Sequence, residues 1–425
     1  MLKKLILENW KSFRYAELPI DPLTVLIGTN ASGKTNAIEA FTFLKRIANG
    51  EKIDHALNSE SEIPSIRGGS DWAILRHREK FSLEILIQGV DEEIEYSYSI
   101  TVEINPVIQI LDEQLTKISL DKGSEADPKQ IKLFQASSNS SQTHRTVSLY
   151  DEETPILDFV GSQSVLSLLS TFYFHVRNLS NTQENQINEG VDRVLESLQN
   201  VFIFDPIPQK MRAFSSLSTE ILSDASNIAG VLAALPNGKK VFVESTLSSY
   251  VSYLPERDIR RVWAEKVGRQ DKDALLYCEE SWASDEPPME VDARKMSDGT
   301  LRFIAIVTAL LTRPEGSQLV IEEVDNGLHP SRAELLLKML KELGAKRKID
   351  ILVTTHNPAL LDALGLKMVP FVVVAHRDAQ TGESKLTSLD DIRHLPKLLA
   401  SGSMGDLATQ GTLEKVLSHS DSVSQ

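Results

Sequence analysis

The sequence reads Leu23-Thr-Val-Leu-Ile-Gly-Thr-Asn-Ala-Ser-Gly-Lys-Thr35 near its start. Its first five residues are apolar except for Thr24 and predict a buried strand, and the apolar spacing from Ala37 to Ile47 predicts a helix after the loop. A glycine-rich loop in this context turns backbone N–H groups inward, and the helix N-terminus adds a positive end. The segment therefore predicts an α/β core that binds a polyphosphate.

The loop from Gly28 to Thr35 matches the pattern G-x-x-x-x-G-K-S/T. In such a loop the lysine, here Lys34, reaches the β- and γ-phosphate oxygens, and the hydroxyl of Thr35 ligates Mg²⁺. ATP and Mg²⁺ are the predicted cofactors. The residues predicted to bind them here are Gly28, Asn30, Ser32, Gly33, Lys34, Thr35 and Asn36.

A second apolar run, Leu319-Val-Ile-Glu-Glu323, ends in two acids. Acids at a strand end put one carboxylate near the metal and the next where it polarises a water for in-line attack. We assign Glu322 to Mg²⁺ and Glu323 to the general base. His356 ends the next apolar run, and this position suits a sensor of the γ-phosphate.

The segment Lys295-Met-Ser-Asp-Gly-Thr300 precedes a helical stretch from Leu301 to Leu311. One interpretation is structural, because serine, aspartate and glycine all suit a helix N-terminus. The functional interpretation is that Ser297 and Gly299 bind a γ-phosphate held by another subunit. The sequence leaves both open.

Further apolar runs at 318–321, 350–354 and 370–374 are typical of parallel strands buried on both faces. Between the first two, Ser331 and Glu334 predict a helix start, and Leu336, Met339, Leu340 and Leu343 form one face. The core is thus split into residues 1–50 and 290–390.

The residues between the two parts of the core show different hydrophobic patterns along their length. Strict alternation from Ile94 to Ile104 predicts antiparallel strands, so residues 51–150 are expected to form a β-meander subdomain. Residues 121–147 are polar and predict an exposed or disordered loop. Residues 151–290 are expected to be a mainly helical insertion with a solvated acidic run at Asp271–Asp292, and residues 391–425 a helical tail.

Composition limits the compartment and the partners. The chain has 425 residues, and 45 basic against 60 acidic residues give a net charge of −15, which excludes a generally basic nucleic-acid coat but not a local basic groove. One cysteine, Cys278, permits no internal disulfide and is expected to be inert and buried. No apolar stretch approaches the roughly 18 residues that span a bilayer, so we expect a cytoplasmic protein without a membrane partner.

Together these motifs, with Gly327-Leu-His-Pro330, resemble the ABC-type ATPase heads of the SMC, RecF and overcoming-lysogenization-defect (OLD) kind. More narrowly, the chain is similar to stand-alone AAA-type ATPases of prokaryotic anti-phage and toxin-like operons. The resemblance implies a P-loop NTPase head in which Ser-x-Gly is the signature completing a partner's site and His356 is the switch histidine. It also implies a homodimer around two ATP molecules, or a higher oligomer, and places Lys11-Ser-Phe-Arg14 beside the nucleotide.

Departures from the family pattern sharpen the prediction. Glu322 stands where most relatives have Asp, which predicts longer or water-mediated metal contact and slower turnover. Leu328-His-Pro330 argues against a transporter head. The glutamine of the Q-loop is not assigned, although Gln88 and Gln109 lie near expected strand ends. Only 69 residues follow His356, too few for the nuclease domain of OLD proteins, and Asp378 alone is weak evidence of a metal.

The resulting hypothesis is an ATP-dependent dimeric switch, the ATPase subunit of an anti-phage defence system that controls a separate nuclease or toxin. One alternative is a DNA-repair or chromosome-maintenance head, for which the candidate phosphate contacts are Arg257, Arg260, Arg261, Lys266, Arg269 and residues 346–348. Another is a nucleotide-sensing scaffold with little turnover.

Overall fold

The computed structural model describes residues 1–58, 66–120, 127–138, 144–151, 157–171, 179–254, 259–281, 287–392 and 395–419. Several residues considered above lie outside these ranges: Arg257, the acids Asp285 and Glu286, and the polar residues 121–126 and 139–143.

The centre of the molecule is a set of parallel strands in the order β10-β15-β16-β3-β17. Their bounds are β3 Leu23–Ile27, β10 Val201–Phe204, β15 Gln318–Ile321, β16 Asp350–Thr355 and β17 Val372–Arg377. They continue through β18 (Ser384–Ser388), β2 (Phe13–Pro19) and β1 (Leu2–Trp10) into one 14-stranded sheet. The predicted parallel core is confirmed, although the last strand begins at Val372 after a 3₁₀ turn.

The parallel strands divide two hydrophobic cores. Leu319 and Ile321 of β15 face one core and Val320 faces the other, because successive side chains of a strand point to opposite faces. One core packs under α8 (Asp298–Thr312), α9 (Ala333–Arg347) and α10 (Pro358–Leu364), the other under α1 (Lys34–Ala48) and α4 (Asn181–Gln199). Burial on both faces explains why these strands read as continuous apolar runs.

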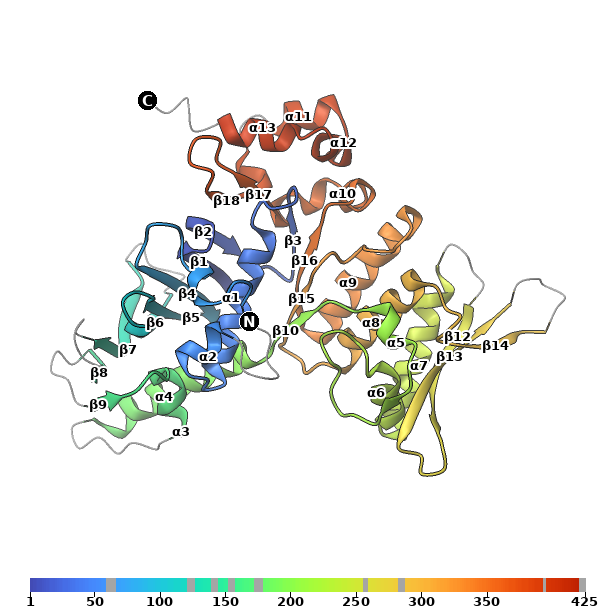
Figure 1. Ribbon diagram of the computed structural model, residues 1–425, viewed down its shortest axis with the longest axis horizontal. Helices are drawn as coiled ribbons and strands as arrows, with labels where there is room; N and C mark the ends of the chain where they lie inside the picture. The colour runs from blue at the N-terminus through green and yellow to red at the C-terminus, as the bar shows by residue number, and fades with distance from the viewer. Residues whose placement is uncertain are drawn as a thin grey trace.

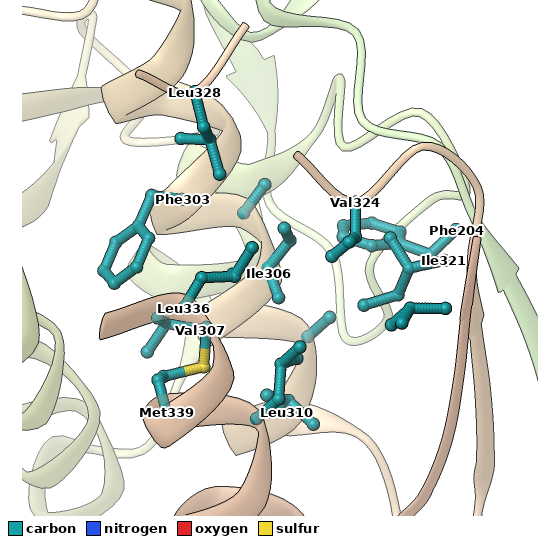
Figure 2. Packing of buried hydrophobic residues seen from close by; sticks show 14 of the residues in the cluster. Phe204, Phe303, Ile306, Val307, Leu310, Ile321, Val324, Leu328, Leu336 and Met339 are labelled. Carbon is teal, nitrogen blue, oxygen red and sulfur yellow. The ribbon is translucent and has the colours of Figure 1, made fainter. Parts of the chain in front are cut away.

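Helix α8 is buried all round, from Gly299 to Leu311. Figure 2 shows why: Ile306 and Leu310 lie between the strand side, with Phe204, Ile321 and Val324, and the helix α9 side, with Leu336 and Met339. The predicted apolar face of α9 is confirmed. The predicted cap is wrong: Ser331 lies within a 3₁₀ turn, Pro330–Arg332, whose cap is His329, and α9 begins at Ala333.

The predicted antiparallel strands extend the sheet away from the core as β4 to β9 (Figure 1). Their bounds are Lys80–Gln88, Ile94–Glu103, Gln109–Ser119, Lys129–Ser138, His144–Leu149 and Leu157–Val160. The expectation of a loop over 121–147 is wrong for the described part, because β7 and β8 fall there. Leu133, Phe134 and Ala136 are buried. This apolar group is short and has polar residues on both sides, so the sequence shows no strand pattern there.

Residues 151–290 contain helices α3 (Val165–Thr171), α4, α5 (Pro208–Met211), α6 (Ile228–Ala234) and α7 (Asn237–Ser252), as expected. They also contain a second sheet, missed in the sequence, of β11 (Ser215–Ser216), β12 (Ile259–Val267), β13 (Asp273–Glu280) and β14 (Met289–Asp292). The acidic run is partly a strand whose alternate residues, including Cys278, are buried. In addition, β10 joins the core sheet, so the inserted residues also supply part of the core.

The chain continues after β18 into α11 (Leu395–Ser401), α12 (Met404–Thr409) and α13 (Thr412–His419), which lie beside α10 and β17 (Figure 1). The short helix α2 (Ile53–Leu57) follows α1. Within the described ranges, no helix is both long and apolar enough to cross a membrane. The division into domains by residue number remains a prediction.

Candidate functional site

The glycine-rich loop joins β3 to α1 and depends on backbone angles that favour glycine. Gly28 has φ 143° and Gly33 has φ 118°, and such positive φ values strain any residue with a Cβ. A Cβ at Gly28 would also lie 2.2 Å from the Ala375 carbonyl oxygen, and one at Gly33 would lie 2.6 Å from Ser384 Oγ. The loop is therefore a closely packed cradle rather than an ordinary surface turn.

Several polar groups of this cradle are suited to an anion. Lys34 Nζ donates to the carbonyls of Gly28 at 2.7 Å and Thr29 at 3.1 Å. Ser32 Oγ is buried and has no hydrogen-bond partner within the described part of the chain. The cap residue of α1, Gly33, supplies no side-chain cap, so the first N–H groups of the helix remain available to a phosphate.

The metal candidates meet at the end of β15. Thr35 Oγ1 donates to Glu322 Oε2 at 3.3 Å. Burial raises the pKa of Glu322 and nearby Asp205 adds to that rise, while the bond from Thr35 opposes it. A bound cation would stabilise the carboxylate that burial disfavours. A hydroxyl and one carboxylate fit Mg²⁺, which takes few protein ligands beside water and phosphate.

Glu323 lies at the same edge in a left-handed conformation, with φ 46°. Its backbone N–H donates to Thr354 Oγ1 at 2.8 Å, and Asn326 Nδ2 donates to its carboxylate at 3.4 Å. Non-glycine residues in this region are uncommon and often mark functional sites. The exposed carboxylate lines a cavity of about 270 Å³ that also contains Asn30, Gly33, Lys34, Thr35, Asn36 and Glu322.

The other predicted residues lie outside this cavity. His356 is exposed just after β16, two residues beyond Thr354, which does line the cavity. Ser297 caps α8, accepting from the Thr300 N–H at 3.1 Å as the structural interpretation expects. Gly299 packs against the backbone of Gly327. A role for these residues in a site shared between subunits remains a prediction.

Two arginines at the cavity were missed in the sequence. Arg67 and Arg377 both line it, and Arg377 Nε holds the loop by donating to the Ala31 carbonyl at 2.9 Å. Neither lies near a motif in the sequence, so only the fold brings them here. Lys11 fixes the Arg67 segment through its bond to the Arg67 carbonyl at 2.9 Å and an ion pair with Glu39 at 2.7 Å.

A second cavity, of about 1380 Å³, adjoins the first and shares Asn36, Arg67 and Arg377 with it. Its lining includes Lys11, Ser12 and Arg14, and Ser12 Oγ accepts from Asn36 Nδ2 at 2.7 Å. The segment from Lys11 to Arg14 therefore lies beside the phosphate cradle, as its motif suggested. The two cavities together are large enough for a whole nucleotide.

The glutamine of the family's Q-loop is not found among the described residues that line either cavity. The strand beside β15 is β10, and the residue that follows it is an acid. Asp205 follows β10 directly, and Arg302 Nη2 donates both to its carboxylate at 2.9 Å and to the Glu322 carbonyl at 3.0 Å. Gln88 and Gln109 bind groups of the meander and line neither cavity. Asp378 is committed to its own turn: bonds from the Thr381 backbone and from Lys385 lower its pKa.

The chain is similar to several known proteins. A family model described as "AAA domain, putative AbiEii toxin, Type IV TA system" matches residues 23–362, which include the loop, the Ser297 turn, both glutamates and His356. An OLD nuclease of Thermus scotoductus is 22% identical over 422 residues, covering 94% of this chain and 67% of that protein. An ATP/GTP phosphatase of Helicobacter pylori is 21% identical over 375 residues, covering 86% and 87%.

Among solved structures, an Smc head bound to the C-winged helix domain of ScpA has a TM-score of 0.50 at 11% identity, covering 91% of this chain and 97% of that one. At that identity the likeness concerns the fold alone. The family match covers most of the chain, so the protein belongs to the AAA-domain family described as putative AbiEii toxin and is an SMC/RecF/OLD-like ATPase.

Proposed function

We propose that this chain binds ATP with Mg²⁺ and hydrolyses it to ADP and phosphate. The observation that carries the proposal is the contact between Thr35 Oγ1 and Glu322 Oε2, 3.3 Å apart at the mouth of the glycine-rich loop. A hydroxyl at the start of the loop helix and an acid at the end of the neighbouring strand form the metal side of a P-loop site. The loop itself supports the phosphate side.

In this proposal Lys34 exchanges its two loop carbonyls for β- and γ-phosphate oxygens. Ser32 Oγ gains a hydrogen-bond partner that it lacks among the described residues. Thr35 and Glu322 hold Mg²⁺, which when bound neutralises phosphate charge. Arg67 and Arg377 add positive charge beside the triphosphate. The larger adjoining cavity takes the nucleoside end.

Glu323 is the proposed general base, because its carboxylate lines the cavity beside the predicted γ-phosphate position. The matched test is Glu323→Gln, which keeps size and polarity but cannot accept a proton. We expect unchanged ATP affinity and a fall in kcat of about 100-fold or more. A hydrolysis rate equal to that of the unmodified protein would remove Glu323 from this role. If the unmodified protein itself shows no steady-state phosphate release, the non-hydrolysing scaffold takes precedence.

We further propose that two copies close around two ATP molecules and reopen after hydrolysis. Ser297 and Gly299 lie outside their own chain's cavity, which suits a role toward a γ-phosphate bound by the partner. ATP and ADP would then differ by several charge-assisted hydrogen bonds across the interface, enough to shift a two-state equilibrium. His356, exposed at the end of β16, is placed to sense that phosphate when the interface forms.

For the biological role we propose an ATPase subunit of prokaryotic anti-phage defence that controls a separate effector, a nuclease or a toxin. The family description and the likeness to an OLD nuclease support this role. The test is plaque formation by a broad phage panel on cells with the native locus, its deletion, and a Lys34→Ala version. Protection that requires both the locus and Lys34 is the expected result, and equal plaque counts on all three strains contradict it.

The alternative of a DNA-binding head has weaker support. On β12, Arg261 stacks over Trp263 at 4.8 Å, and at the end of α9 Lys346 lies over Phe242 while Arg347 pairs with Glu315 at 3.1 Å. These cations already have partners within the chain. ATP-dependent DNA binding that weakens steeply with salt would nevertheless favour this alternative.

A further inference from the structure

The turn before α8 is held by side chains from the inserted part of the chain. Arg212, which follows α5, donates through Nη2 to the Met296 carbonyl at 2.8 Å and to the Asp298 carboxylate at 2.6 Å. These two acceptors belong to the residues on either side of Ser297. Gln209 Nε2 adds a contact to the same carboxylate at 3.3 Å. One guanidinium therefore fixes both flanks of Ser297.

The opposite side of the turn is also fixed. An added Cβ at Gly299 would lie 2.5 Å from the Gly327 carbonyl oxygen and 3.0 Å from Arg332 Nη1. Gly299 is buried, whereas Ser297 and Asp298 are exposed. The turn thus presents Ser297 and Asp298 outward while its backbone is held between Arg212 and the segment after β15.

The charge of Asp298 is the second observation. A carboxylate next to Ser297 would repel any phosphate that approaches this turn, and like charges at close range in a dry interface repel strongly. The ion pair with Arg212 at 2.6 Å neutralises it. Because the same Arg212 Nη2 also donates to the Met296 carbonyl, the guanidinium fixes the orientation of the turn as well as its charge.

Arg212 is linked to its own chain's nucleotide edge. It lies in a segment, 205–212, that begins at Asp205, whose carboxylate accepts from Arg302 Nη2 at 2.9 Å. Arg302 Nη1 also donates to the Pro206 carbonyl at 2.9 Å, and its Nη2 to the Glu322 carbonyl at 3.0 Å. The segment therefore spans from the proposed metal ligand to the Ser297 turn.

We propose that Arg212 is a positioning residue for hydrolysis in trans: it orients Ser297 and Gly299 toward the γ-phosphate bound by a second copy of this chain and neutralises Asp298 there. This inference rests on the proposed function, because it requires two copies that share nucleotide sites. Arg212 itself does not touch the nucleotide of its own chain, whose cavity it does not line.

The kinetic signature follows from that placement. Arg212→Ala should lower kcat about tenfold or more, because misplacing a group by about 1 Å can cost still more, while the Kd for ATP at the chain's own loop stays within about twofold. Arg212→Lys keeps the charge and should recover part of the loss. Arg212→Ala combined with Asp298→Asn should recover part as well, because the uncompensated carboxylate is gone. Arg294→Ala is the matched control, since Arg294 pairs with Asp292, two residues away, at 2.7 Å.

Mixing Arg212→Ala, which is expected to hydrolyse ATP slowly, with a variant that cannot hold ATP tests the trans arrangement. Lys34→Ala cannot hold ATP but keeps an intact Ser297 turn, whereas Arg212→Ala keeps its loop. In a two-fold symmetric dimer, a hybrid of the two has one complete site. An equimolar mixture should therefore hydrolyse ATP at about a quarter of the unmodified rate, because half of the dimers are hybrids and one of two sites works. A mixture of Lys34→Ala with Glu323→Gln has no complete site and should stay inactive.

The outcomes separate this inference from the proposed function. If Ser297→Arg mixed with Lys34→Ala regains activity but Arg212→Ala mixed with Lys34→Ala does not, sites are shared and the role of Arg212 is overturned. If neither mixture regains activity, the shared site itself fails. Loss of ATP binding by Arg212→Ala, or no rescue by Arg212→Lys, would show a general structural role and also overturn the inference.

Discussion

Two helices of this protein begin at turns with opposite designs. Helix α1 begins at Gly33, which has φ 118° and supplies no side-chain cap, and the buried Ser32 Oγ beside it has no partner among the described residues. Helix α8 begins at Ser297, which has ordinary extended angles and accepts from the Thr300 N–H at 3.1 Å. The first turn keeps its polar groups available, and the second is already satisfied within the chain.

This difference indicates what each turn requires from a ligand. An uncapped helix start with orphan N–H groups gains most from an anion bound by its own chain. A start that is already capped within the chain gains less from an anion. This difference agrees with the proposal that ATP binds first to the glycine-rich loop and then recruits the Ser297 turn of a second copy.

The largest expected effect is at the loop. In Gly33→Ala the positive φ and the 2.6 Å approach to Ser384 Oγ displace the backbone, so ATP affinity should fall by about 100-fold or more. Isothermal titration calorimetry measures it. Gly238→Ala is the control, because nothing lies within 4 Å of the added Cβ; equal losses in both variants would contradict the special role of the loop.

The second-largest effect is expected at Glu322, the predicted Mg²⁺ ligand of the same site. Glu322→Gln should remove most of the Mg²⁺-dependent gain in ATP affinity, about tenfold or more, because the carboxylate is the charged ligand. Without Mg²⁺ the variant should bind ATP as well as the unmodified chain does. Titrations of ATP in the presence of Mg²⁺ and in the presence of EDTA measure the affinity with and without the metal. If the affinity of Glu322→Gln depends on Mg²⁺ as much as that of the unmodified protein does, Glu322 is not the metal ligand.

At the opposite end of the parallel strands from the glycine-rich loop, a buried acid is expected to affect stability rather than nucleotide binding. Burial raises the pKa of Asp350, at the start of β16, from 3.8 to about 6. Because the folded state holds the proton more tightly than the unfolded state, stability is full below pH 4 and falls as the pH rises through about 6. Asp350→Asn should flatten that slope and raise the free energy of unfolding at pH 7 by up to about 3 kcal/mol, measured by urea unfolding across pH. The ATP affinity of Asp350→Asn should equal that of the unmodified protein. A changed affinity would show that the start of β16 and the glycine-rich loop, at opposite ends of the parallel strands, are coupled.

The smallest effect is expected at the capped turn. Ser297→Ala loses the bond from the Thr300 N–H and should cost about 1 kcal/mol of stability, seen as a small fall in Tm. The ATP affinity of the Ser297→Ala variant should be unchanged, whereas that of Gly33→Ala should fall. A large loss of nucleotide binding would place Ser297 in its own chain's site and contradict the comparison.

Those parts of the fold that follow local patterns could be predicted from the sequence. The buried strands from Leu23, Gln318 and Asp350 are continuous apolar runs, and the loop between Gly28 and Thr35 carries its own signal, so these strands and the closeness of Thr35 to Glu322 could be predicted. The roles of these residues in binding ATP and Mg²⁺ remain predictions. Strands β12 and β13 were not predicted, because each buries mainly a short apolar group, 262–264 and 274–276, between charged residues, which gives no clear alternation in the sequence. Arg67, Arg212 and Arg377 were missed since each reaches its site only through tertiary contacts.

In the proposed switch, ATP held by one chain recruits the Ser297 turn of another. The most direct measurement is solution mass by light scattering on Glu323→Gln, with and without ATP and Mg²⁺, because arrested hydrolysis should trap the closed state. We expect ATP to double the mass or to compact an existing dimer, and we expect the added substitution Ser297→Arg to abolish the change. Bound nucleotide with no change in mass or size would contradict the proposed switch.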